Sequence, residues 1–174
     1  MEIKKMPIKY NFTKGNNRRI EFIVIHDTGN PNAGANALMN YKYFAAADRG
    51  ASAHYFVDDK EIIQIIDDKD IAWHVGDAKN PPTINGAIPK NANSIGIEIC
   101  INEDGDYFKA LQNAIELTKH LMQQYNIPPE RVIRHYDVSG KICPQSMSGF
   151  NGKNYTWVLW KWFKKQITIS LNAN

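Results

Sequence analysis

Cysteine is scarce in this chain of 174 residues, which contains only Cys100 and Cys143. Two cysteines cannot build a disulfide scaffold, although a single bridge between them stays open at this stage. No apolar run approaches the roughly 18 residues that a membrane span needs. The first seven residues also lack the apolar core of a secretory signal. We therefore expect no membrane span and no signal peptide.

The chain also lacks a large excess of charge of one sign, because 21 lysine and arginine residues are mixed with 18 aspartate and glutamate residues. The net charge is +3, without the dense basic block that wraps nucleic acid. We expect no nucleic-acid partner, while the mild positive charge favours an anionic surface or polymer. The 43% of hydrophobic residues suffice for one substantial core, which predicts a single domain, 1–174. We expect it to be a monomer.

Alternating strand and helix patterns predict an α/β layered domain, with a central mixed β-sheet flanked by about three helices. Residues 1–19 are polar and contain chain breakers, which indicates an N-terminal arm around a core of residues 20–168. The predicted strands are 20–26, 54–57, 62–66, 72–75, 95–101 and 132–135. The predicted helices are 35–46, 107–125 and 155–167. A long loop, 77–93, is of the kind that compact domains keep for function.

Three side chains with suitable chemistry for a metal ion follow predicted strands. His135 ends a short strand, and Cys143 follows it after a loop that can return to the same place. The best third candidate is His26, at the end of the strand that carries Phe22 to Ile25. Zinc suits mixed nitrogen and sulfur donors, and a catalytic zinc site uses three protein ligands and one open position. The sequence therefore predicts a zinc site.

Two further residues suit hydrolysis of an amide at such a site. Strict alternation in 95–101 puts the isoleucines on one face of a strand, and Gly96, Glu98 and Cys100 on the other. Glu98 is thus a carboxylate that can accept the proton of an attacking water and return it to the leaving amine. Lys141 offers positive charge where the oxyanion develops, a contribution of roughly 3 to 4 kcal/mol for a well-placed donor.

Five short motifs occur in a fixed order along the chain. They are His26-Asp27-Thr28-Gly29, Ser52-Ala53-His54-Tyr55-Phe56-Val57, Ala72-Trp73-His74-Val75-Gly76, Ser94-Ile95-Gly96-Ile97-Glu98, and His135 followed by Cys143-Pro144. Together they resemble the zinc N-acetylmuramoyl-L-alanine amidases of the type-2 amidase family, which includes phage endolysins, bacterial autolysins and peptidoglycan recognition proteins. The resemblance spans about residues 20–165 and implies a fold like that of T7 lysozyme and the recognition proteins.

By this resemblance, His26, His135 and Cys143 are the zinc ligands and Lys141 matches a catalytic lysine. The implied substrate is peptidoglycan, and the implied reaction cuts the amide between N-acetylmuramic acid and L-alanine. Some members carry a catalytic tyrosine immediately before the histidine matched by His54.

That tyrosine position is occupied by Ala53. The difference argues against a tyrosine-assisted mechanism and assigns the acid/base role to Glu98, as in members that use a strand glutamate.

We expect His54, His74 and Thr28 to contact the substrate. The alternative for both histidines is to orient a neighbour without binding metal. Cys100 is expected to be a small buried hydrophobe, with metal ligation or pairing with Cys143 as the alternatives. At helical spacing, core packing is favoured over sugar binding for three tryptophans, Trp157, Trp160 and Trp162.

Two functional classes stay open at this point. One is a zinc amidase of the cell wall, and the other is a non-catalytic muropeptide recognition module on the same fold. Recognition members typically lose the cysteine, so Cys143 favours catalysis. A general metallopeptidase has no His-Glu-x-x-His helix to support it. We expect a protein made in the cytoplasm that acts on the cell wall, either phage-encoded or exported by a separate route.

Overall fold

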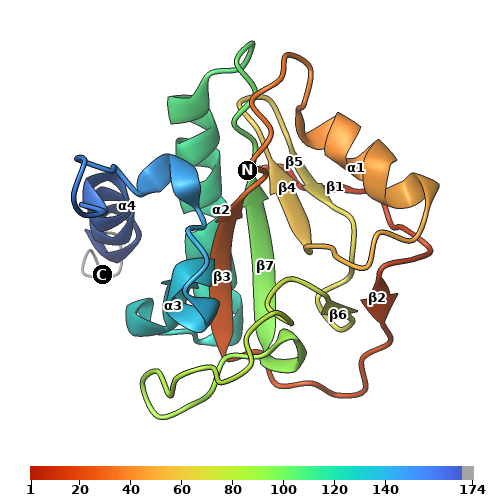
Figure 1. Cartoon of the computed structure of the whole chain (residues 1–174). Coiled ribbons are helices and arrows are strands. Elements are labelled where there is room, and N and C mark those ends of the chain that lie inside the picture. Colours follow the sequence, from red (N-terminus) through yellow and green to blue (C-terminus); the bar gives the residue numbers. More distant parts are fainter. Residues whose placement is uncertain (170–174) are drawn as a thin grey trace.

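The computed structural model describes residues 1–169, which form a layered α/β domain around a six-stranded mixed sheet (Figure 1). The strand order is β1-β5-β4-β7-β3-β8, and β2 and β6 form a separate small sheet. The strands are β1 Lys4–Lys5, β2 Phe12–Thr13, β3 Phe22–Asp27, β4 Tyr55–Val57, β5 Ile62–Gln64, β6 Ile71–Ala72, β7 Ser94–Ile99 and β8 Val132–Arg134. The α-helices are α1 Ala37–Ala46, α2 Tyr107–Tyr125, α3 His135–Ser139 and α4 Val158–Ile169.

Strands β3 and β7 lie at the centre of the sheet and run parallel to each other. Every residue of β3 is buried, as its run of Phe22 to Ile25 predicts for a strand covered on both faces. Strand β8 is parallel to β3 and β4 is parallel to β7, whereas β5 is antiparallel to β4 and β1 runs in the same direction as β5. The carboxyl ends of β3, β4 and β7 therefore meet at one edge of the sheet.

The two faces of the sheet are covered differently. Helices α2 and α4 pack against the face that carries the isoleucines of β7, together with Ile23 and Ile25. Figure 1 shows α2 behind β3 and β7, with α4 to one side. The opposite face carries His26 and Glu98 and is partly covered by α1, which packs with Phe56 and Ile63. The space between α1 and the chain after β8 remains for a site.

Helix α2 shows how directly some sequence signals determine the fold. Asp106 caps it by accepting a hydrogen bond from the Lys109 N–H, and Asn126 ends it in the left-handed conformation. Its bounds are those predicted from the apolar periodicity. The hairpin of β4 and β5 and the helix α1 are also confirmed, with shorter ends.

The prediction of a strand over 72–75 was wrong beyond Ala72. The Trp73 N–H donates to the Ser52 hydroxyl, and the His74 and Val75 N–H groups both donate to Asn91 Oδ1. Side chains thus take the hydrogen bonds that a neighbouring strand would make.

Other boundaries shift as well. Strand β3 spans Phe22–Asp27 rather than 20–26, and β7 spans Ser94–Ile99 rather than 95–101. Strand β8 stops at Arg134, so His135 begins a short helix rather than ending a strand. The predicted C-terminal helix starts at Val158, because Tyr155 forms an isolated bridge with Phe150.

The N-terminal residues wrap the core by adding strands. Lys4 and Lys5 pair in parallel with β5, and Phe12 and Thr13 pair with β6. No helix among the described residues is long and apolar enough to cross a membrane.

Candidate metal centre and active site

His26, His135 and Cys143 come together as a buried group, with one potential ligand atom from each lying within 4.8 Å of the others. Cys143 Sγ is 3.6 Å from His26 Nδ1. In a tetrahedral zinc site, a sulfur ligand at about 2.3 Å and a nitrogen ligand at about 2.0 Å lie roughly 3.5 Å apart. The donor set and its spacing therefore fit zinc, as the sequence predicted.

Local hydrogen bonds explain how His135 and Cys143 reach the same point. Asp137 accepts from the backbone N–H and the guanidinium of Arg134, which starts the short helix α3 at His135. Gly140 ends α3 in the left-handed conformation, with φ of 80°, and the chain turns back. The Tyr136 N–H then donates to the Cys143 carbonyl at 3.0 Å.

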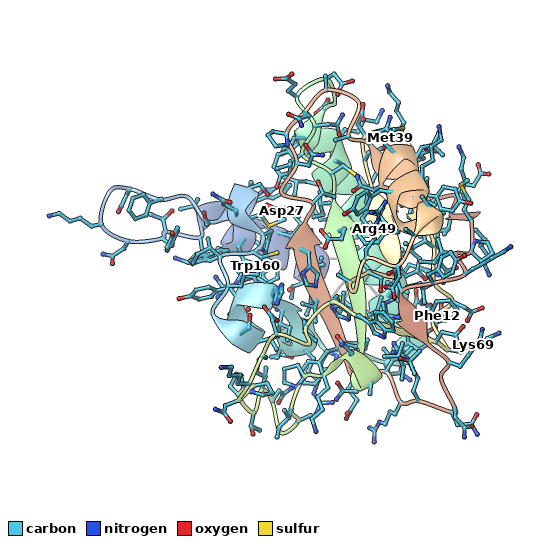
Figure 2. All side chains as sticks on the ribbon, turned by 45° about the vertical axis from the view of Figure 1, so that its right-hand side comes forward. Phe12, Asp27, Met39, Arg49, Lys69 and Trp160 are labelled. Atoms are coloured by element: carbon cyan, nitrogen blue, oxygen red, sulfur yellow. The ribbon has the colours of Figure 1, made fainter. Side chains whose placement is uncertain are left out.

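Asp27, which follows His26, binds the chain just after Cys143. Its Oδ2 accepts from the Ser146 N–H at 2.7 Å. Its own backbone N–H faces the Cys143 thiol, and this contact opposes the larger effect of burial, which raises the pKa of that thiol. Figure 2 shows Asp27 at the end of β3. No local pattern around Asp27 indicates this role.

Both histidines have a partner on the Nε2 nitrogen of the ring. His26 Nε2 lies 3.1 Å from His74 Nδ1, and His135 Nε2 lies 2.8 Å from Asp77 Oδ1. Burial lowers the pKa of His26 well below its usual value, and the nearby His74 and His135 lower it further. Burial also lowers the pKa of His135, although Asp77 partly opposes this. Both rings are thus held neutral, as metal ligation requires.

Glu98 projects from β7 beside His26, its register partner on β3. Burial raises the pKa of Glu98 to about 8, the charge of Asp27 adds to this, and Lys141 opposes it. Among the described residues, Glu98 Oε2 has no hydrogen-bond partner although it is buried. A buried oxygen of this kind needs a partner from outside the protein chain, such as water or substrate.

A cleft of about 530 Å³ opens beside Glu98 and runs along α1. Thr28 lines it, and its buried hydroxyl is a second oxygen without a partner within residues 1–169. Met39 and Tyr43 of α1 form another part of the wall, and their side chains are 48% and 52% exposed. Figure 2 labels Met39 on this helix. The sequence did not indicate a role in a cleft for either residue, because apolar residues at helical spacing are typical of core packing.

Lys141 lies on the exposed turn between α3 and Cys143. Its positive charge is close enough to lower the pKa values of Glu98, His26 and His135. Lys141 therefore lies near the cluster, and its role at the oxyanion stays a prediction.

His54 is brought near the site but has no free surface. It is completely buried, its Nδ1 accepts from the Gly96 N–H, and its Nε2 lies 3.2 Å from the Asp70 carbonyl. Burial and the charge of Arg18 lower the pKa of His54 to about 3. Contact with a substrate would require β4 to move. We therefore assign a structural role to His54, whose hydrogen bond with Gly96 links the start of β4 to β7.

The remaining alternatives are decided by burial. Cys100 is a free thiol in the hydrophobic cluster that α1 forms with Phe56 and Ile63, called here the α1 cluster. It lies outside the metal group. Trp157 and Trp160 belong to the core, and Trp162 packs against it. These findings agree with the expected packing roles.

The fold and the cluster place a zinc-type set of ligands at the carboxyl end of a mixed sheet. Residues 16–146 match the family model described as N-acetylmuramoyl-L-alanine amidase (Amidase_2). The chain belongs to this family.

Individual relatives agree with this assignment. The chain is 40% identical over 126 residues to the N-acetylmuramoyl-L-alanine amidase CwlH of Bacillus subtilis, covering 72% of this chain and 48% of CwlH. It is 41% identical over 126 residues to XlyA of the same organism, covering 72% of this chain and 40% of XlyA. The chain thus spans less than half the length of these relatives.

Solved structures match almost the whole chain. The catalytic domain of XlyA superposes with a TM-score of 0.79 and 35% identity, covering 96% of this chain and 99% of that domain. PlyL gives a TM-score of 0.76 and 32% identity, covering 96% of this chain and 97% of PlyL.

Proposed function

We propose that this chain hydrolyses the amide bond between the lactyl group of N-acetylmuramic acid and L-alanine in peptidoglycan. The observation that carries the proposal is the joint presence of two features on one face of the sheet. One is the buried group of His26, His135 and Cys143. The other is Glu98 beside it, whose Oε2 has no hydrogen-bond partner in the described part of the chain. Membership of the amidase family indicates which bond is cut and that the substrate polymer is peptidoglycan.

The chain's own groups account for the proton transfers. Glu98 Oε2 accepts a proton from the attacking water, and Glu98 returns it to the nitrogen of L-alanine as the carbon–nitrogen bond breaks. Lys141 places positive charge near the carbonyl oxygen, where negative charge develops. His26, His135 and Cys143 would hold a zinc ion, which when bound would lower the pKa of a water molecule and polarise the carbonyl.

The cleft along α1 is suited to the muropeptide. Thr28 offers a hydroxyl close to the reacting bond, and Met39 and Tyr43 offer apolar surface further away. This mixture of apolar walls and few polar groups is typical of ligand clefts. We propose that the substrate lies there and that the protein acts on the cell wall.

The second candidate is a recognition module that binds muropeptides without cutting them. The complete group of His26, His135 and Cys143 favours hydrolysis over this function.

Digestion of purified peptidoglycan tests the proposal. The wild-type chain should release new N-terminal L-alanine without new reducing sugar ends, because the proposed attack is at the lactyl amide. Reducing ends without alanine termini would overturn the assignment. Binding to the polymer without any new termini would instead support the recognition module.

A further inference from the structure

Two residues in one loop contact the outer nitrogens of both histidines in the metal group. These are His74, which contacts His26, and Asp77, which contacts His135. A neutral imidazole carries its single proton on one nitrogen, and a metal binds the other. This loop can therefore determine which ring nitrogen of each histidine carries the proton and which is left to bind the metal.

The hydrogen bonds behind His74 have one consistent direction. Ser94 Oγ lies 2.6 Å from the Lys90 carbonyl, which can only accept, so the hydroxyl donates to it. The hydroxyl proton is then used, and Ser94 Oγ accepts from His74 Nε2 at 3.1 Å. His74 consequently carries its proton on Nε2.

The same logic extends to His26. His74 is buried, and among the described residues its ring hydrogen bonds to Ser94 and His26, with no carboxylate to balance a positive charge, so the ring is neutral and Nδ1 has no proton. His26 Nε2, at 3.1 Å from that nitrogen, must then donate. This leaves His26 Nδ1 unprotonated, 3.6 Å from Cys143 Sγ.

Packing holds this chain of hydrogen bonds in place. His26, His74 and Ser94 are all buried. The His74 ring lies against the backbone of Gly96, where an added Cβ would come within 2.8 Å of His74 Cγ. Asn91 Oδ1 accepts from the His74 N–H at 3.0 Å and fixes the backbone at the ring.

We propose that His74 is a positioning residue that, through Ser94 and the Lys90 carbonyl, keeps the proton of His26 on Nε2 and its Nδ1 lone pair directed at the metal. His74 thus acts through His26, without touching metal or substrate. The inference deepens the metal site on which the proposed function rests. Its test measures zinc binding, so it can fail while the amidase activity stands.

The test compares two replacements of His74 in the full-length chain. In His74→Asn, the amide Oδ1 occupies nearly the place of Nδ1 and can still accept from His26, whereas His74→Leu removes the acceptor. We expect His74→Leu to weaken zinc binding by about 10- to 100-fold, the usual effect of losing a ligand's outer hydrogen-bond partner. His74→Asn should retain most of the affinity. Competition with a chromophoric chelator measures both.

Packing alone predicts the opposite order, because leucine suits a buried position better than asparagine. Equal affinities, or weaker binding by His74→Asn, would therefore overturn the proposal. Thermal unfolding of each zinc-loaded variant shows whether it is folded. If both replacements unfold, Ser94→Ala is a smaller change that serves the same test. It should also weaken zinc binding. Wild-type affinity in Ser94→Ala would contradict the proposal.

A spectroscopic signature follows as well. In zinc-loaded protein with ¹⁵N-labelled histidine, His26 should show a slowly exchanging proton on Nε2 and the metal on Nδ1. This protected proton should persist in His74→Asn and exchange rapidly in His74→Leu. Metal on His26 Nε2 in the wild type would refute the assignment directly.

Discussion

His26 and Glu98 are register partners on the parallel strands β3 and β7, and their side chains leave the same face of the sheet. The pairing of these strands thus sets the distance between a metal ligand and the proposed proton carrier. A register shift of one residue would turn either side chain to the opposite face. Chemistry at this site is therefore fixed by the most buried part of the fold.

The two cysteines provide a matched pair for the metal centre. Cys143→Ser should lose zinc affinity by more than the roughly 10- to 100-fold typical of losing an outer partner, because a hydroxyl is a far poorer ligand than a thiolate. Cys100→Ser should keep wild-type zinc content, since Cys100 lies in the α1 cluster. Metal analysis after dialysis measures both. Normal zinc in Cys143→Ser, with loss in Cys100→Ser, would reverse the assignment.

Lys141 should contribute to the transition state and little to substrate binding. Lys141→Ala is expected to lower kcat by about 100- to 1,000-fold with a small change in KM. Lys161 is an exposed lysine on α4, on the other side of the sheet, and Lys161→Ala should be as active as wild type. Steady-state kinetics on soluble muropeptides separate the two parameters. A change confined to KM would show that Lys141 only binds substrate.

The cleft along α1 should affect substrate affinity. Tyr43→Ala removes an exposed aromatic wall, and we expect KM to rise roughly 10-fold with kcat almost unchanged. Phe108 is equally exposed, at 52%, and lies on α2 away from the cleft, so Phe108→Ala is the control. Equal KM values for the two variants would remove the cleft from substrate binding.

Metal-free protein should become less stable as pH rises because of Glu98. Its pKa is raised from 4.5 to about 8 in the folded state, so folding favours the protonated form. This stabilisation is complete below the unfolded pKa and is lost as pH rises through the folded one. Relative to Glu98→Gln, the wild type should lose up to about 1.4 kcal/mol of unfolding free energy per pH unit in this window.

Urea unfolding of both metal-free proteins, from about pH 5 to about pH 8, measures this difference. Groups far from Glu98 contribute equally in the two proteins, so their effects cancel in the difference. A difference that stays constant with pH would show that the buried carboxyl titrates normally.

The sequence predicted those features that depend on local pattern. Periodicity located α2, and alternation placed Glu98 and the isoleucines of β7 on opposite faces. The ordered motifs identified the three candidate ligands, which the fold brings together.

Features that depend on contacts between distant segments were missed. Asp77 lies 58 positions from His135, and nothing local to either residue indicates their hydrogen bond. His74 was expected to contact substrate or, as the alternative, to orient a neighbour; that this neighbour is His26 follows from Gly96 and Asn91, which act from other segments. Burial of His54 likewise depends on how β4 joins β7.

Glu98→Gln tests the central claim most directly, because it keeps the size of the side chain but cannot carry a proton. We expect this variant and the wild type each to bind about one zinc per chain. Its release of N-terminal L-alanine from peptidoglycan should fall by about 100-fold or more. Measuring zinc content and alanine termini on the same preparation separates loss of metal from loss of proton transfer. Full zinc with wild-type release of alanine would contradict the account.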